Sequence, residues 1–286
     1  MPPFVKTFFD DSTNNASHVV RDPDSDACAI IDSVLDFDLA SGQTSTKAAD
    51  SIAAYIREEE LRVDWILETH VHADHLSAGP YLKETLGGQT GVGAHITAVQ
   101  ETFAGVFNAG SDFATDGSQF DHLFADGETI SIGVLEGHVM HTPGHTPACV
   151  SYVFGDAVFV GDTLFMPDFG TARCDFPGGD AKALFASIHK VLALPPETRL
   201  FMCHDYMPNG RDVMWETTVA TEKADNLHVR DGVNEAEFVK MRTARDAKLD
   251  MPGLILPSVQ VNMRAGHMPP PEANGLTYLK LPVDAL

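Results

Sequence analysis

The chain has 286 residues and few basic side chains: 19 Lys and Arg residues stand against 41 Asp and Glu residues, which gives a formal net charge of −22. Nucleic acids and anionic membranes are bound by basic surfaces, so this charge argues against both as partners. A small anionic substrate is still compatible with it, because one local arginine can outweigh a diffuse negative field.

Cysteine is scarce, and long apolar runs are absent. The four cysteines are far apart and form no Cys-x-x-Cys pair, so we expect a reducing compartment. The first residues lack the basic start and long apolar stretch of a signal peptide. No uninterrupted run of about 18 apolar residues predicts a transmembrane helix. These features favour a cytoplasmic location without membrane contact.

The rest of the composition is ordinary. Hydrophobic residues make up 44% and charged residues 21%, which excludes a disordered, collagen-like or coiled-coil chain. Strand-like and helix-like segments predict an α/β protein of two packed sheets with helices outside, in one domain over residues 1–286. We expect strands at 5–9, 18–21, 28–32, 63–67, 129–132, 139–142, 149–154, 157–160, 200–203 and 276–281, and helices at 46–60, 77–86, 181–194, 216–227 and 235–249.

The most informative segment is His70-Val71-His72-Ala73-Asp74-His75, which follows a predicted strand and opens a predicted helix. Four potential ligands in six residues converge only if the chain turns sharply at the strand end. Imidazole and carboxylate are the ligands that borderline transition metals prefer. The alternative is a polar loop that merely holds three histidines, but this density of ligands favours a metal site.

Three more potential ligands each follow a predicted strand or lie in a turn between strands. His145 has a proline on either side, Asp162 follows the apolar run 157–160, and His204 follows the run 200–203. Taken singly, each has an ordinary explanation, either a solvated loop histidine or a carboxylate that caps a helix. Together they are more specific, because one edge of a sheet can gather residues that leave several strands.

The order His-x-His-x-Asp-His, Gly-His, Gly-Asp and a late His resembles the metallo-β-lactamase superfamily, and the resemblance covers most of the chain. It implies an αββα sandwich of two mixed sheets flanked by helices, with metal at one edge of the sheets. The motif says little about the substrate, because members hydrolyse β-lactams, thioesters, lactones and phosphodiesters, and some oxidise sulfur.

Further segments narrow this resemblance. The chain is similar to the persulfide dioxygenases, also called sulfur dioxygenases, in residues 146–149, 171–176, 204–206 and 262–266. Residues 29–33 and the ending 275–281 are similar to the bacterial branch of that family, which includes proteins named as β-lactamase-like hydrolases. The resemblance thus implies oxidation of a sulfur compound.

In that family the resemblance implies one Fe(II) per chain, held by His70, His145 and Asp162. Two neutral imidazoles and one carboxylate on one face of an iron leave three positions open. The remaining residues of the pattern either bond to ligands and waters from outside the coordination shell or hold a second metal in a two-metal relative: His72, Asp74, His75 and His204.

The implied reaction converts glutathione persulfide, O₂ and water to sulfite and glutathione. Glutathione carries two carboxylates, for which Arg173 and Arg264 are candidate partners; the alternative for each arginine is a salt bridge. Tyr206 is either a hydrogen-bond donor near the metal or a half-buried core residue. Cys174 either lines the pocket or is packing. The resemblance is also compatible with a homodimer.

Other classes of function use the same residues. A glyoxalase II-type hydrolase of a glutathione thioester would hold two Zn(II) or iron ions, and a β-lactamase or lactonase is a related alternative. Against the thioesterase, the segment after His204 lacks the basic residues that such enzymes place in a helical C-terminal region. A non-catalytic metal-binding module is the last alternative; an intact ligand set beside an arginine and a tyrosine argues against it.

Overall fold

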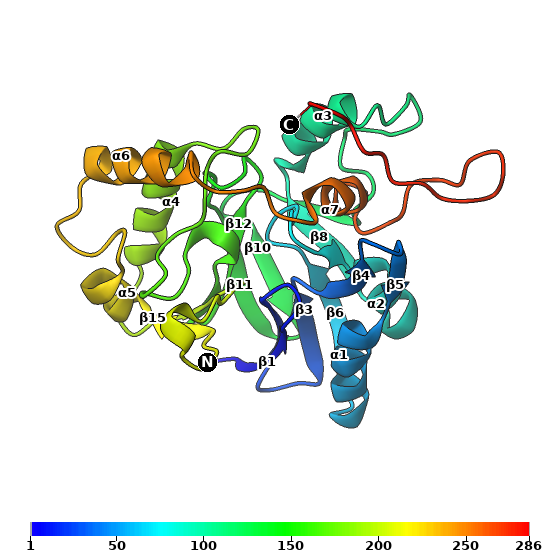
Figure 1. Ribbon diagram of the computed structural model, residues 1–286. Coiled ribbons are helices and arrows are strands. Elements are labelled where there is room, and N and C mark those ends of the chain that lie inside the picture. Colours follow the sequence, from blue (N-terminus) through cyan, green and yellow to red (C-terminus); the bar gives the residue numbers. More distant parts are fainter. Residues whose placement is uncertain (1, 286) are drawn as a thin grey trace.

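Two six-stranded sheets pack face to face, with helices on their outer sides (Figure 1). This computed structural model describes residues 2–285. The first sheet has the order β1-β2-β3-β6-β8-β9, and its strands are β1 (Phe4–Asp10), β2 (Asn15–Arg21), β3 (Ala27–Ile31), β6 (Arg62–Leu67), β8 (Gln89–Gly93) and β9 (His122–Phe124).

The second sheet has the order β10-β11-β12-β13-β14-β15. Its strands are β10 (Thr129–Ile132), β11 (Leu135–His141), β12 (Val150–Phe154), β13 (Ala157–Phe159), β14 (Arg199–Phe201) and β15 (Glu216–Thr218). A small third sheet joins β5 (Gln43–Ser45), β4 (Val34–Asp38) and β7 (Leu76–Ser77).

The helices cover the outer faces of the sheets because each has one apolar side. The helix α1 (Lys47–Glu58) buries Ala49, Ile52, Ala53 and Ile56 against the first sheet, where α2 (Gly79–Leu86) lies beside it. On the second sheet lie α4 (Ala181–Leu192), α5 (Val219–Asp225) and α6 (Glu235–Asp246); α3 (Ile96–Val106) and α7 (Ile255–Asn262) share a separate apolar cluster.

The apolar core between the sheets draws on both of them. Ile31 and Leu67 of the first sheet share one cluster with Tyr152, Phe154 and Phe159 of the second. Burying aromatic and aliphatic side chains on two facing sheets is what holds such a sandwich together. The predicted αββα arrangement is therefore confirmed.

Several elements differ from the sequence-based expectation. The strand expected at 276–281 is wrong: these residues pair with no strand, and Leu276 and Leu281 are exposed. The helix expected at 216–227 begins as strand β15 before it turns into α5. The strand β8 and the helices α3 and α7 were not predicted. In β8 the two glycines weaken the strand signal.

The strand exits meet at one edge of the sandwich. In the second sheet β11, β13 and β14 run in the same direction, so their carboxyl ends lie at the same edge. The strand β6 of the first sheet ends three residues before His70. Within residues 2–285, no helix combines the length and the apolar character needed to cross a bilayer.

Candidate metal centre

Three side chains from three strand exits converge at this edge. His70 follows β6, His145 lies between β11 and β12, and Asp162 follows β13. The Nε2 atoms of His70 and His145 lie 3.8 Å and 3.6 Å from Asp162 Oδ2. One ligand atom from each of the three residues lies within 4.8 Å of the others. The structure thus brings together the three residues that the resemblance implies as ligands.

Hydrogen bonds on the far side of each imidazole orient the two rings. His145 Nδ1 lies 2.8 Å from the carbonyl oxygen of Arg173. His70 Nδ1 lies 2.9 Å from Thr69 Oγ1, whose own hydroxyl donates to Asp32 Oδ2. Both partners accept, so each ring carries its proton on Nδ1 and turns the Nε2 lone pair toward the cluster. Burial and the neighbouring imidazoles lower the pKa of His70 well below its usual value, which favours the neutral form that binds metal.

Several buried polar atoms at this edge have no hydrogen-bond partner within the described residues. They are His70 Nε2, Asp162 Oδ1, His75 Nε2, Asp74 Oδ2 and His204 Nε2. Burying a polar atom without a partner costs roughly 1–3 kcal/mol, and a bound cation removes that cost. The donor set also matches the preference of borderline metals, so these residues form a metal-binding cluster.

A second group of ligands lies beside the first and shares Asp162 with it. This group consists of His72, Asp74, His75 and His204. His204 Nε2 lies 3.2 Å from Asp74 Oδ2 and 3.6 Å from Asp162 Oδ1. Burial opposes ionisation of Asp74, but His204 and His75 hold its pKa well below the usual range. The donor arrangement is therefore compatible with two neighbouring cations as well as with one.

His72 faces two carboxylates through its Nε2 atom. Its Nε2 lies 3.1 Å from Asp32 Oδ1 and 3.2 Å from Glu68 Oε2. Burial alone would lower the pKa of His72, but these two carboxylates raise it well above the usual value. The two acids thus occupy Nε2, while the buried Nδ1 of the same ring has no hydrogen-bond partner among the described residues and is the ring's remaining ligand atom.

Two glycines let the ligand loops approach their neighbours closely. Gly161, directly before Asp162, has a φ of +51°, and a Cβ there would lie 2.5 Å from Thr69 Oγ1. Gly144, directly before His145, has a φ of +140°, and a Cβ there would lie 2.3 Å from the Cα of Leu184 in α4. A larger residue at either position would displace a ligand.

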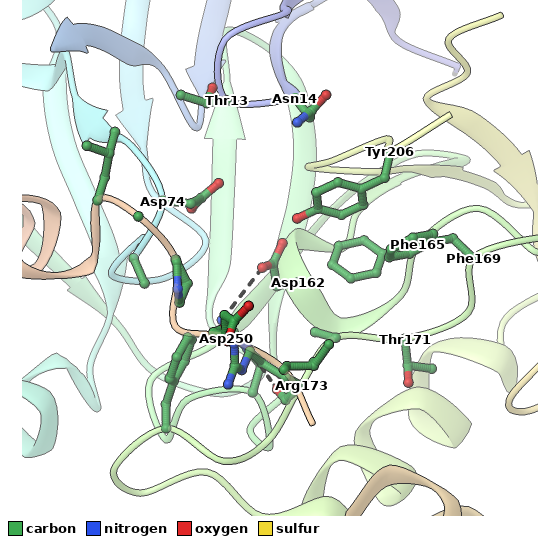
Figure 2. A pocket seen from close by; sticks show the side chains of 18 of the residues that line it. Thr13, Asn14, Asp74, Asp162, Phe165, Phe169, Thr171, Arg173, Tyr206 and Asp250 are labelled. Carbon is green, nitrogen blue, oxygen red and sulfur yellow. Dashed lines mark hydrogen bonds and ion pairs between the residues drawn. The ribbon is translucent and has the colours of Figure 1, made fainter. Parts of the chain in front are cut away.

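A cavity of about 470 Å³ opens onto the cluster (Figure 2), within the range of about 300–1,000 Å³ that is usual for small-molecule sites. Asp74, His145 and Asp162 line its inner end. Aromatic rings form one wall, where Phe169 stacks on Tyr206 with ring centres 4.6 Å apart. The cavity thus joins a polar, metal-binding floor to an apolar wall.

Tyr206 combines a core-like ring with a hydroxyl directed at the centre. Figure 2 shows this hydroxyl pointing toward Asp162. The residue is 39% exposed, but burial of its phenol, with the nearby charges of Asp162 and Asp74, raises its pKa well above the usual value. The phenol therefore stays protonated and is able to donate a hydrogen bond into the cavity.

Arg173 lines the cavity and is already paired. Its Nε and Nη2 donate to the carboxylate of Asp175 at 2.6 Å and 2.7 Å, and its Nη1 donates to the carbonyl oxygen of Asp250 at 2.6 Å. Two of the five guanidinium N–H groups are left for another partner. The structure thus combines the two sequence-based alternatives, a place at the site and a salt bridge.

Arg264 and Cys174 lie away from the cavity lining. Arg264 donates to the carbonyl oxygen of Gln260 at 2.7 Å and lies over the ring of Phe113. Cys174 belongs to the apolar cluster on the outer face of the second sheet, and burial raises the pKa of its thiol to about 12. Neither residue is brought together with His70, His145 and Asp162.

The role of Asp32 was missed from the sequence. It follows β3 directly and accepts hydrogen bonds from the backbone and the hydroxyl of Thr69 as well as facing His72. A carboxylate at the exit of an apolar strand is the same signal that singled out Asp162, so the pattern was available. What the pattern lacked was any indication that this strand ends beside the histidine segment.

Residues from the C-terminal third were also missed. Asn262 donates to the carbonyl oxygens of His72 and His75 at 2.9 Å and 2.8 Å, which holds the histidine segment in place. Arg242 and Arg245 of α6 line the cavity. The region after His204 therefore does bring basic residues to the cavity, which weakens the sequence-based argument against a thioesterase.

A family model described as the metallo-beta-lactamase superfamily matches residues 12–204. The chain belongs to this superfamily. It is 59% identical to a protein named "Probable metallo-hydrolase" from Burkholderia pseudomallei over 99% of both chains. Several relatives named "Beta-lactamase hydrolase-like protein" are longer, and the chain spans 65% of their length.

Other relatives of this superfamily member carry two different activity names. "Glyoxylase B2" from Dictyostelium discoideum is 52% identical, with 94% of this chain and 92% of that protein covered. "Persulfide dioxygenase ETHE1, mitochondrial" from Bos taurus is 29% identical, with 94% and 91% covered. The crystal structure of ETHE1 from Myxococcus xanthus superposes with a TM-score of 0.73 at 28% identity, covering 92% of this chain and all of that one.

Proposed function

We propose that the protein is an iron-dependent persulfide dioxygenase that oxidises glutathione persulfide to sulfite and glutathione. The observation that carries the proposal is the convergence of His70, His145 and Asp162, each of which offers one ligand atom within 4.8 Å of the others. The Nε2 atom of His72 faces Asp32 and Glu68 instead. Two histidines and one carboxylate are the ligand set typical of non-haem Fe(II) oxygenases. The similarity to proteins named persulfide dioxygenase supports the same reading.

An Fe(II) held by these three residues would supply open coordination positions and redox capacity for O₂ and sulfur together. In the overall reaction the S–S bond of the persulfide breaks, the outer sulfur is oxidised to sulfite, O₂ is reduced, and water provides the third oxygen. The four electrons that the sulfur loses are those that O₂ takes up, so no further reductant is needed.

The residues of this chain position the substrate and exclude water. The protonated phenol of Tyr206 is directed toward the centre and donates a hydrogen bond to the substrate there. The rings of Phe165, Phe169 and Phe176 line the cavity and limit the water around the reacting sulfur. Arg173 contacts the substrate with its free N–H groups, while its carbonyl oxygen orients His145. His204 and Asp74 bond to ligands and waters beside the iron.

The direct test is oxygen uptake by the iron-loaded protein with glutathione persulfide, together with elemental analysis. We expect about one iron per chain and consumption of O₂ with formation of sulfite. A matched sample of the Asp162→Ala variant controls for uncatalysed persulfide oxidation. Two zinc ions per chain with full thioesterase activity and no oxygen uptake would overturn the proposal.

A glutathione-thioester hydrolase is the second candidate, favoured by the second ligand group. Asp162 lies between the two groups, and a carboxylate shared by two cations suits a two-metal site that activates water. One relative is named as a probable metallo-hydrolase, and another is named Glyoxylase B2. Metal content separates the candidates, because this reaction requires Asp74, His75 and His204 as ligands of a second ion.

A further inference from the structure

The charged residues that line the cavity fall into two sets. The first set has its place explained: Asp74 and Asp162 face the histidines of the metal-binding cluster, Arg173 pairs with Asp175, and Arg242 pairs with Asp246. In the second set are Arg245 and Asp250, whose side chains make no hydrogen bond or ion pair with any residue that the structure describes. Among residues 2–285, the cavity lining therefore has one cation and one anion without a partner.

Arg245 lies at the outer end of the aromatic wall. Its guanidinium carbon is 5.9 Å from the ring centre of Phe169, and Phe169 stacks on Tyr206, whose hydroxyl points toward Asp162. Arg245 also stands in the last turn of α6, where a cation interacts favourably with the helix dipole. That effect explains a basic residue at this position but not its place on the cavity.

Asp250 is tied to the site through its backbone. Its carbonyl oxygen accepts the hydrogen bond from Arg173 Nη1, and Figure 2 shows the residue beside Arg173. The guanidinium of Arg173 is engaged by the carboxylate of Asp175, and Asp250 lines the cavity with an exposed side chain that has no partner among residues 2–285. This free acid is available to a positive group of a substrate.

We propose that Arg245 and Asp250 form a subsite for the zwitterionic α-amino acid end of a thiol substrate. Arg245 binds the α-carboxylate and Asp250 binds the α-ammonium group. The inference rests on the proposed function, in which the sulfur at the other end of the same molecule reaches the metal centre. The γ-glutamyl end of glutathione carries both charges on one carbon atom, remote from its sulfur.

This subsite selects the class of persulfide. A coenzyme A persulfide carries phosphates, with which Arg245 can pair, but it has no ammonium group for Asp250, which is left unpaired and repels the phosphates. A small thiol without an amino acid end leaves both charges of the subsite unpaired. The cavity therefore favours amino-acid-bearing persulfides over phosphorylated or simple ones, through the difference in pairing at its mouth.

The test measures binding of reduced glutathione to the iron-loaded protein by calorimetry without O₂. The second probe is glutaryl-cysteinylglycine, which keeps the carboxylate but lacks the ammonium group. We expect Arg245→Gln to lower the affinity for both ligands about three- to tenfold, as for a partly exposed charge pair. We expect Asp250→Asn to lower the affinity for glutathione by a similar factor and to leave the affinity for glutaryl-cysteinylglycine unchanged.

Lys240→Gln is the matched control, because Lys240 is exposed on the same helix, is not on the cavity, and changes the net charge by the same unit. Equal binding of both ligands by Arg245→Gln, Asp250→Asn and Lys240→Gln would overturn the subsite. If the protein takes up oxygen with glutathione persulfide but the variants do not show the expected changes in binding, only the subsite is overturned. If the variants show these changes but the protein takes up no oxygen, only the dioxygenase activity is overturned.

Discussion

His70 and His72 stand two residues apart in one motif, yet their rings have opposite surroundings. His70 turns an unpartnered Nε2 toward Asp162, and burial holds its pKa well below the usual value. His72 turns Nε2 toward Asp32 and Glu68, which raise its pKa well above the usual value. Two identical side chains thus differ in their free nitrogen: His70 keeps Nε2 without a partner, whereas His72 turns Nε2 to two acids and keeps Nδ1 without a partner among the described residues. The difference lies in what packs around each ring.

The largest effect that this comparison predicts is the loss of metal when His70 is removed. In His70→Ala the centre loses one of its three ligands, so we expect metal affinity to fall more than about 100-fold, beyond what outer partners are worth. Iron per chain after dialysis against a chelator measures the effect. His95→Ala, which removes an exposed histidine, is the control. Metal content at the wild-type level in His70→Ala would break the comparison.

The next effect concerns His72→Ala, for which we expect activity to fall about 10–100-fold with most of the metal retained. The same outcome is expected for His204→Ala. In His72→Ala, Asp32 and Glu68 are left buried and unpaired, which should cost about 3–5 kcal/mol in the free energy of unfolding. Oxygen uptake measures the activity, metal analysis measures the retained metal, and urea unfolding measures the loss of stability.

A second substitution shows whether charge is the cause of this loss. Adding Asp32→Asn to His72→Ala removes one of the two uncompensated charges and should recover part of the stability. Complete loss of iron in His72→Ala or His204→Ala would mean that these residues are ligands instead. No recovery in the double variant would mean that lost packing, and not charge, explains the cost.

Arg173 extends the comparison from the ligands to the cavity wall. Arg173→Ala should raise KM for glutathione persulfide about tenfold, with iron content unchanged, because a charge-assisted contact is worth roughly 1.5–3 kcal/mol. Arg173→Lys should restore only part of this, since lysine lacks the planar fork. Oxygen consumption against persulfide concentration measures KM. An unchanged KM in Arg173→Ala would leave Arg173 as the partner of Asp175 only.

Glu222 is a buried carboxylate with no cationic partner among residues 2–285, and so contrasts with Asp32. Burial raises its pKa from 4.5 to about 8, and one oxygen accepts a hydrogen bond from the Asn226 amide at 2.6 Å. Between these two values the unfolded chain loses this proton and the folded chain keeps it. Stability should therefore fall as pH rises through this window, by at most about 1.4 kcal/mol per pH unit.

The variant Glu222→Gln tests this smallest effect, because glutamine cannot ionise. We expect the free energy of unfolding to depend less on pH in Glu222→Gln than in the wild type, as measured in urea from pH 5 to pH 8. Glu101→Gln, in an exposed position on α3, is the control. Parallel pH curves for the wild type and Glu222→Gln would show that Glu222 is ionised in the folded protein.

Much of the fold could be predicted from periodicity, and some of it could not. The spacing of Ala49, Ile52 and Ile56 predicts α1, because a helix repeats every 3.6 residues. The sequence of β8 hides a strand, since its glycines show no alternation and it is buried between neighbours. The segment 276–281 alternates like a strand, but it pairs with no strand among the described residues.

The sequence predicted the metal-binding residues of the candidate site, but it predicted few of the residues that line the cavity around them. His70, His145 and Asp162 were found because each leaves a strand and carries a metal-binding group. Arg245 and Asp250 come from the region around the end of α6, and no local pattern links that region to the cluster. Arg264 was expected near the substrate, but its guanidinium is turned to Gln260 and Phe113.

The sequence by itself determined the superfamily, the αββα architecture and the kinds of ligand, because these depend on local spacing and on the chemistry of each side chain. Only the tertiary structure decided which nitrogen of which histidine faces the metal centre, because the deciding partners, Asp32 and the carbonyl oxygen of Arg173, are far away along the chain. It also decided which charges of the cavity stay unpaired, since pairing depends on the distances between side chains from different elements.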